Sequence, residues 1–97
     1  MTYYAVTRER GERWDLARGM REQKDWHQHA AFMEALVDDG FVVLGGPSGD
    51  GSKTLLIVDG ENEEQIRARL LDDPWAPTDL LRVAKIERWE ILLSRER

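Results

Sequence analysis

The order of strand-like and helix-like segments constrains the fold of this chain more than any other feature of its sequence. Short runs rich in aromatic, aliphatic and β-branched residues predict strands at residues 2–8, 41–46, 53–59 and 80–93. Helical spacing predicts one helix that runs from Asp25 to about Asp39 and a second at residues 63–71. The resulting order, β-α-β-β-α-β, is that of the ferredoxin-like α+β fold, in which a four-stranded antiparallel sheet carries both helices on one face.

The helix ends carry signals of their own. Asp25 with Gln28, and Asn62 with Gln65, match the capping-box spacing at the two helix starts. Gly40 follows the first helix and is suited to the left-handed backbone conformation that closes many helices. These signals predict the helix boundaries independently of the apolar spacing.

The strand patterns also predict how the sheet is covered. Residues 41–46 (FVVLGG) are apolar on both faces, so we expect this strand not to lie at an exposed edge. Alternation changes phase within residues 80–93, which predicts one long strand with a bulge near Glu87 or Arg88. Two helices cover only one face of the sheet, so apolar residues on the other face predict a second copy of the chain over it, and hence a homodimer.

Length and composition exclude several classes of protein. With 97 residues, of which 41% are hydrophobic and 34% charged, we expect one globular domain over residues 1–97. There is no cysteine, which excludes disulfides, thiolate nucleophiles and sulfur metal sites. The sequence lacks a signal-peptide pattern and a long apolar run, so we expect a cytoplasmic protein without membrane contact. A formal net charge of -5 disfavours nucleic acid as a partner.

The two histidines of the chain fall on different sides of the first predicted helix. At about 100° per residue, His29 lies in the middle of an apolar arc with Phe32 and Leu36, whereas His27 lies about 160° away on the polar side. His27 is therefore expected in solvent. A polar ring that faces the core needs a partner, because burying it unsatisfied costs on the order of a few kcal/mol. His29 is either a structural histidine bonded to a backbone carbonyl or a functional residue.

Other short motifs do not indicate metal or nucleotide sites. His27 and His29 point away from each other on a helix and cannot chelate one metal ion, so we expect no metal site. Residues 46–54 (GPSGDGSKT) have the glycine spacing of a phosphate-binding loop, but Ser52 stands where lysine is needed and a strand follows where a helix is needed. No redox-cofactor motif is present, and we expect no cofactor.

An ordered series of motifs extends over nearly the whole chain, residues 3–93. From His29 to Pro47 the sequence reads H-x2-F-M-x2-L-x3-G-x3-L-G-G-P, and Asp73-Pro74 follows the second helix. In the order and spacing of these motifs the chain resembles the YCII-related (YciI-like) family. The resemblance implies a dimeric α/β barrel built from ferredoxin-like subunits.

The resemblance also implies an active site. The family has a histidine early in the first helix and an aspartate directly before a proline, which together form a dyad. The matching positions in this sequence are His29 and Asp73, and Asp72 is not the match. A relative is associated with removing chloride from a chlorinated hydroxyhydroquinone, and the wider fold includes muconolactone isomerase. The resemblance thus implies proton transfer on small ring compounds. Trp75 is a candidate to line the same cavity, although a place in the core or in a dimer interface explains it equally well.

The sequence departs from shorter members of the family in the long segment of residues 8–24. This segment holds six basic and four acidic residues. Arg18 and Arg21 are therefore candidates to bind a substrate carboxylate, with Trp14 or Trp26 as a wall for a ring. The alternative is a solvated charged loop that is pinned by its apolar residues.

Two hypotheses of function remain. In the first, the protein is a small-molecule enzyme of the lyase or isomerase type, in which His29 moves a proton and Asp73 orients the imidazole or stabilises its charged form. In the second, it is a non-catalytic dimeric module that binds a small metabolite or supports a partner domain. The fold does not decide between them, because ferredoxin-like scaffolds host unrelated chemistries. The first hypothesis requires His29 and Asp73 to face one cavity within hydrogen-bonding reach.

Overall fold

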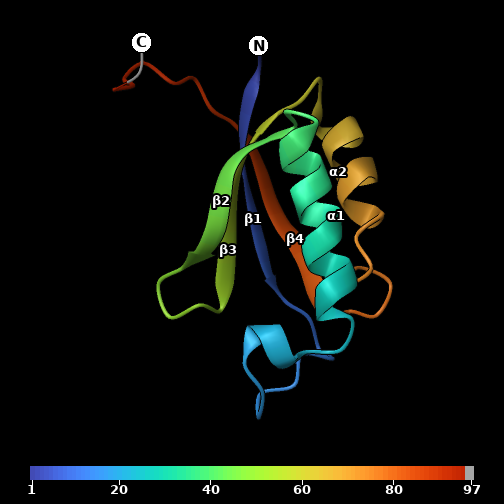
Figure 1. Ribbon diagram of the computed structural model, residues 1–97. Coiled ribbons are helices and arrows are strands. Elements are labelled where there is room, and N and C mark those ends of the chain that lie inside the picture. Colours follow the sequence, from blue (N-terminus) through green and yellow to red (C-terminus); the bar gives the residue numbers. More distant parts are fainter. Residues whose placement is uncertain (96–97) are drawn as a thin grey trace.

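The computed structural model describes residues 1–95 and has the predicted order of elements (Figure 1). The strands are β1 (Tyr3–Arg10), β2 (Val42–Ser48), β3 (Lys53–Asp59) and β4 (Leu81–Arg88). The helices are α1 (Trp26–Asp38), α2 (Glu63–Leu71) and a short 3-10 helix, η1 (Met20–Glu22). Within residues 1–95, no helix has the length and apolar character needed to cross a membrane.

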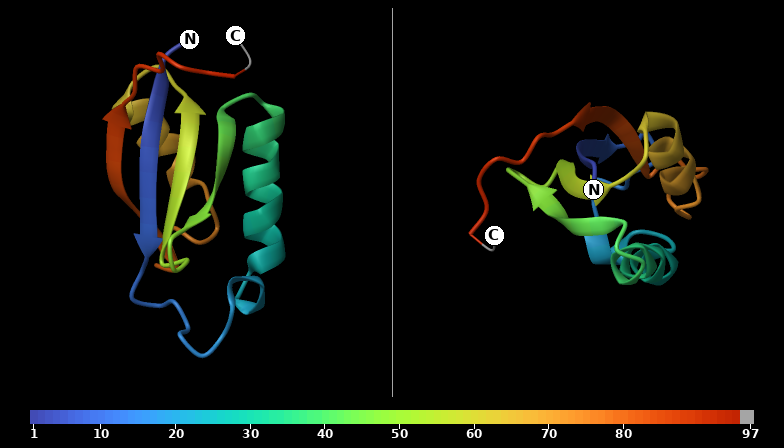
Figure 2. Two further views of the ribbon diagram at one scale, coloured as in Figure 1. Left: turned by 90° about the vertical axis from the view of Figure 1, so that its left-hand side faces the viewer. Right: turned by 90° about the horizontal axis from the view of Figure 1, so that it is seen from above.

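The four strands form one antiparallel sheet in the order β2-β3-β1-β4. Both α-helices cover the same face of this sheet, and the chain after β4 passes along the opposite side (Figure 2). This arrangement confirms the predicted ferredoxin-like α+β fold, with a four-stranded antiparallel sheet and two helices on one face.

The helix-covered face carries the main hydrophobic core. Alternation along β1 turns Val6 toward the helices, where it pairs across the sheet with Leu56 of β3 and Ile86 of β4. Leu36 of α1 and Ile66 of α2 complete the centre of this cluster. The apolar face of each helix, which repeats about every 3.6 residues, thus packs against the apolar face of the sheet, which repeats every two residues.

A second apolar cluster lies beside the start of β4. Its members are the buried Trp75, Leu80 and Leu81 and the partly buried Trp14, Met20 and Trp26. Trp14 and Met20 come from the long charged segment after β1. The apolar residues of that segment therefore pin it against the body of the domain.

The prediction that residues 41–46 avoid an exposed edge is wrong. β2 is an edge strand that pairs only with β3, and its Val43 and Leu44 are 49% and 62% exposed. The reason is connectivity, because in a β-α-β-β-α-β sheet the first and third strands take the centre whatever the composition of the others. Val42 faces the core, whereas Leu44 lies opposite Ile57 on the open face of the sheet.

The last strand differs from its prediction in length and in the place of its bulge. β4 ends at Arg88 rather than at residue 93, because its partner β1 begins at Tyr3 and the backbone of Thr2 is hydrogen-bonded to Asp59 and Gly60 instead. The register against β1 shifts between Thr7 and Arg8, so the unpaired residue is Ala84 and not Glu87 or Arg88. A bulge at Ala84 and an early strand end together account for the change of phase in the sequence.

The two helix starts also differ. The Asn62 side chain accepts a hydrogen bond from the backbone N–H of Gln65 at 2.8 Å, as predicted. Asp25 makes no such bond, so the capping-box prediction for α1 is wrong. Asp25 has φ 60° and ψ 28°, whereas a capping side chain reaches the helix N–H groups from an extended backbone. Gly40, with φ 80°, has the predicted left-handed conformation after α1.

Candidate active site

His29 lies on the face of α1 that is turned toward the sheet, and its ring contacts a residue far along the chain. His29 is 8% exposed, whereas His27 is exposed to solvent. The imidazole Nδ1 is 2.9 Å from Oδ1 and 2.8 Å from Oδ2 of Asp73, which is 44 residues away in sequence. The predicted placement of both histidines is confirmed, and the partner of His29 is a carboxylate rather than a backbone carbonyl.

Asp73 stands between the end of α2 and Pro74, and donors enclose its carboxylate. It is 1% exposed, whereas the adjacent Asp72 is exposed. Oδ2 accepts a hydrogen bond from Arg8 Nη2 at 2.5 Å, and Oδ1 accepts one from the backbone N–H of Trp75 at 2.9 Å. Proline disfavours a helical backbone at the residue before it, so α2 ends here and the chain turns this carboxylate inward.

Arg8 is the third member of this buried cluster, and no sequence motif singled it out. It is 3% exposed and lies on β1 two residues after Val6, on the same face of the sheet. Its Nη1 donates to the sulfur of Met33 at 3.4 Å. The signal that would have identified it is strand alternation, because an arginine on the core face of a strand needs a buried acidic partner. We refer to Arg8, His29 and Asp73 as the buried cluster.

Burial and pairing act in opposite directions on the charges of the buried cluster. Burial raises the pKa of the Asp73 carboxyl, but the hydrogen bond from His29, the charge of Arg8 and the N–H of Trp75 outweigh it and hold this pKa below its ordinary value. Burial lowers the pKa of Arg8, and the nearby Asp73 opposes this effect. Arg8 and Asp73 thus form an ion pair at neutral pH. The carboxylate accepts from Nδ1–H of His29, so the neutral tautomer compatible with this bond carries its lone pair on Nε2.

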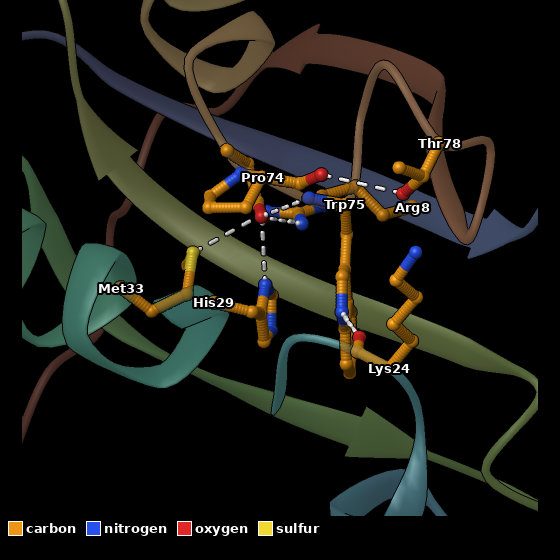
Figure 3. Close-up of polar contacts among 8 residues, drawn as sticks. Arg8, Lys24, His29, Met33, Pro74, Trp75 and Thr78 are labelled. Atoms are coloured by element: carbon orange, nitrogen blue, oxygen red, sulfur yellow. Dashed lines mark hydrogen bonds and ion pairs between the residues drawn. The ribbon is translucent and has the colours of Figure 1, made fainter. Parts of the chain in front are cut away.

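Trp75 fixes the plane of the His29 ring. The two rings stack with centroids 3.8 Å apart and planes 6° apart (Figure 3). Trp75 is 1% exposed, and its indole N–H donates to the backbone carbonyl of Lys24 at 2.6 Å (Figure 3). The Trp26 ring lies 5.8 Å from each of these two rings. A hydrogen bond at one edge and a stacked indole on one face therefore restrict rotation of the imidazole.

A cavity of about 340 Å³ lies beside the His29 ring, between α1, the sheet and the β2–β3 hairpin. Its walls include His29, Trp75, Met33, Trp14, Arg8 and Arg10. This volume falls within the range of small-molecule sites. Nδ1 of His29 is hydrogen-bonded to Asp73, and within residues 1–95 Nε2 has no hydrogen-bond partner. Nε2 is therefore the ring nitrogen that remains for a ligand.

The other candidate residues have different surroundings. Trp75 lines the cavity, whereas Trp26 packs against His29 from outside its wall. Arg21 is exposed and its Cζ lies 5.8 Å from the centroid of the Trp26 ring. Arg18 is paired with a neighbouring carboxylate at 3.3 Å. Neither Arg18 nor Arg21 lines the cavity, so the structure does not bring the two predicted arginines to the histidine.

The acidic and histidine side chains form no evident metal centre. Among residues 1–95, no group of three or more histidine, aspartate or glutamate residues is placed to hold a metal ion. His29 and Asp73 are bonded to each other, with Arg8 as the next neighbour.

Comparisons with known proteins bear on the fold. No model of a known protein family matches the sequence, and no curated protein sequence matches it. Among solved structures, the chain is similar to 5-chloro-2-hydroxyhydroquinone dehydrochlorinase from Burkholderia phenoliruptrix in complex with 2,5-dihydroxybenzoquinone. The TM-score is 0.65 at 20% sequence identity, over 93% of this chain and 94% of that chain. Agreement over nearly the full length of both chains shows a shared fold.

Proposed function

We propose that this protein is a small-molecule enzyme of the lyase or isomerase type, in which His29 and Asp73 carry out general acid-base catalysis. The observation that supports the proposal is the position of His29: Nδ1 is held by the buried Asp73 carboxylate at 2.8 Å, and the ring forms part of a cavity wall. A structural histidine needs no cavity beside its second nitrogen. A general base needs one, because the substrate proton has to reach it.

The charges of the buried cluster suit a base of this kind. With a neutral imidazole, the cluster has no net charge, because the Arg8 guanidinium balances the Asp73 carboxylate. When Nε2 takes a proton from the substrate, the cluster gains one positive charge and the substrate becomes an anion. The imidazolium is then stabilised by Asp73 on one side and by the substrate anion on the other.

The fate of the proton and of the electron pair distinguishes the two reaction types. In an elimination, the substrate anion expels a leaving group, which departs with its bonding electrons, and the proton passes to solvent from His29. In an isomerisation, the imidazolium returns the proton to a different substrate atom. Both reactions use the same nitrogen and need no further group on the protein.

The walls of the cavity favour a small cyclic or aromatic substrate. Trp14, Trp75 and Met33 offer apolar surface on which a planar ring packs. The structural neighbour removes chloride from a chlorinated hydroxyhydroquinone, as its name states. Together with the motif series from His29 to Asp73, this likeness supports membership in the YCII-related family and makes 5-chloro-2-hydroxyhydroquinone the first compound to assay.

The test is chloride release from 5-chloro-2-hydroxyhydroquinone by the wild type and by three variants. We expect His29→Gln to lower kcat by at least about a hundredfold, since a positioned general base contributes about 10²–10⁴ in rate. Asp73→Asn is expected to lower kcat because it removes the carboxylate that sets the tautomer. His27→Gln is the matched control, and we expect it to retain the wild-type rate because His27 is exposed.

A wild type that does not act on this compound calls for a ligand search before the variants are compared. Small lactones and hydroxyquinones that shift the ring NMR signals of His29 but not of His27 are the compounds to assay next. Equal turnover of an identified substrate by the wild type, His29→Gln and Asp73→Asn would rule out the dyad. The protein would then be the alternative, a non-catalytic module in which His29 only contacts the metabolite.

We also propose that the protein is a homodimer joined through the open face of its sheet. Leu44 and Leu55 on this face are 62% and 41% exposed and lie on neighbouring strands, β2 and β3. Contiguous apolar surface of this kind is typical of an interface. Leu55→Glu is expected to convert a dimer into a monomer in size-exclusion chromatography with light scattering. Leu71→Glu, at a leucine of α2 that is 68% exposed, is the control and should leave the dimer intact. A monomeric wild type contradicts the proposal.

A further inference from the structure

Arg10 differs from the other arginine in the cavity wall. Arg8 is paired with Asp73 at 2.5 Å. Arg10 lies two residues further along β1 on the same face, and within residues 1–95 its side chain makes no ion pair and no hydrogen bond. Its Nε is buried without an acceptor. The cavity therefore contains a guanidinium whose donors are not used by the rest of the described chain.

Aromatic packing holds this guanidinium at the cavity. Arg10 Cζ lies 4.9 Å from the centroid of the Trp14 ring, and Trp14 packs edge-on against Trp75 at 5.6 Å. Trp75 in turn stacks on His29. A series of rings along one wall thus connects Arg10 with the imidazole. Stacking on an indole occupies the face of a guanidinium and leaves its in-plane N–H groups free to donate.

Neither Asp50 nor Glu34 forms an ion pair with Arg10 within residues 1–95. Asp50, in the turn between β2 and β3, accepts a hydrogen bond from the backbone N–H of Ser52 at 2.9 Å. Hydrogen bonds with Ser52 are the main cause of the lowered pKa of Asp50, and the charge of Arg10 contributes without a direct contact between the two side chains. Glu34 lines the cavity from α1 but is exposed to solvent. An anion that enters the cavity therefore meets an unpaired cation at the Arg10 end.

We infer that Arg10 binds a carboxylate of the substrate, and that the substrate is a small planar acid whose ring lies along the tryptophan wall toward His29. This inference rests on the proposed function for the identity of the site and adds the class of its substrate. The planar fork of an arginine matches a carboxylate through two parallel hydrogen bonds. The apolar walls and the volume of about 340 Å³ suit a single ring rather than a larger molecule.

The experiment compares benzoate with benzamide, which have nearly the same shape and differ in charge. Binding is measured by isothermal titration calorimetry and by the ring NMR signals of His29, with His27 as the internal reference. We expect the wild type to bind benzoate at least about tenfold more tightly than benzamide, as one charge-assisted bidentate contact provides. Benzoate should shift the His29 signals and leave those of His27 in place.

Two substitutions of Arg10 separate its charge from its packing. Arg10→Met keeps an unbranched apolar stem against Trp14, and we expect it to lose the preference for benzoate while its affinity for benzamide changes by less than about twofold. Arg10→Lys keeps the charge without the planar fork and should retain only part of the preference. Arg82→Met, at an arginine paired with Asp79 at 2.9 Å, is the control and should bind both compounds as the wild type does.

Three results would each overturn this inference: a wild type that does not bind benzoate, equal wild-type affinity for both compounds, or a full preference for benzoate in Arg10→Met. The wild-type comparison decides even if an Arg10 variant fails to fold. His29→Gln separates this inference from the proposed function, since it should lose turnover and keep the preference for benzoate. If turnover depends on His29 but binding shows no preference for a carboxylate, only the role of Arg10 is overturned. If binding depends on Arg10 but no turnover is found, only the catalytic role is overturned.

Discussion

His27 and His29 lie two residues apart on α1, and Asp72 and Asp73 are adjacent after α2, yet only one member of each pair belongs to the buried cluster. His29 and Asp73 are 8% and 1% exposed and are joined at 2.8 Å. His27 and Asp72 are exposed to solvent. Residue type is the same within each pair, so position relative to the helix axis and the helix end decides which side chain is buried and paired. Each pair also provides a matched control for experiments.

The comparison shows what burial of a charge requires. The Asp73 carboxylate accepts hydrogen bonds from Arg8, from His29 and from the backbone N–H of Trp75. A buried ion with fewer partners is costly, because the protein must replace the hydration that the ion loses. Asp72 keeps that hydration and needs no such set of donors. The same residue type therefore has a structural cost in one position and almost none in the other.

The largest difference between the paired residues is expected for alanine substitutions of the aspartates. Asp73→Ala leaves the Arg8 guanidinium, 3% exposed, without its carboxylate. Removing one member of a buried ion pair lowers the free energy of unfolding by about 3–5 kcal/mol. Asp72→Ala is expected to stay within about 0.5 kcal/mol of the wild type. Urea unfolding followed by tryptophan fluorescence measures both, and equally small changes would mean that the ion pair does not form in solution.

The members of the buried cluster differ in how far they were predictable from sequence. The side of α1 on which His29 lies follows from the fixed period of a helix. Asp73 is 44 residues away, and only the ordered series of motifs connected the two. Arg8 ended the predicted strand of residues 2–8 and was also counted in the charged segment of residues 8–24, so its side chain was not assigned to a face of the sheet. Alternation from Val6 already places Arg8 on the core face, and Arg10 follows because β1 continues to that residue.

The fold was easier to predict than its details. The order of elements fixes a ferredoxin-like sheet, since few topologies join these elements by short connections. The edge position of β2 and the bulge at Ala84 depend on which strands pair and in what register, and composition alone does not report either. The cavity wall depends on Trp14 folding back onto Trp75, a contact between residues 61 positions apart. Contacts of that kind leave no local pattern.

A smaller difference is expected when the free energy of unfolding is followed as a function of acidic pH in asparagine variants of the two aspartates. The pKa of Asp73 in the folded protein is held below its ordinary value, which is about 3.9 in an unfolded chain. Its contribution to stability is therefore complete above about pH 4 and is lost as the pH falls through the unfolded value toward the depressed folded value. Asp73→Asn is expected to flatten this acid limb, and Asp72→Asn, at an exposed neighbour outside the buried cluster, is the matched substitution for comparison.

The measurement is the free energy of unfolding in urea at a series of acidic pH values. Asp50 also has a lowered pKa, owing mainly to its hydrogen bonds with Ser52, so some pH dependence remains in Asp73→Asn. The difference between this variant and the wild type isolates Asp73. Parallel curves for the two proteins would show that the carboxylate has the same pKa in the folded and unfolded states.

The smallest expected effect concerns two glutamines that look equivalent in sequence. Gln28 and Gln65 each lie three residues after an apparent N-cap. The Gln65 side chain accepts a hydrogen bond from the backbone N–H of Glu61 at 2.9 Å. Gln28 makes no hydrogen bond through its side chain within residues 1–95. Asp25 has a left-handed backbone, whereas a capping box needs an extended one at the N-cap.

Alanine substitutions at these two positions isolate the cap, because both gain the same helix propensity. Gln65→Ala loses one hydrogen bond and is expected to cost about 0.5–1.5 kcal/mol, offset by a few tenths from the better helix former. Gln28→Ala loses no bond and should be neutral or slightly stabilising. For a domain of this size, 1 kcal/mol corresponds to a shift of about 4–8 °C in Tm, so thermal unfolding resolves the two. Equal losses of stability in the two variants would mean that α1 begins with a formed capping box and that Asp25 has an extended backbone in solution.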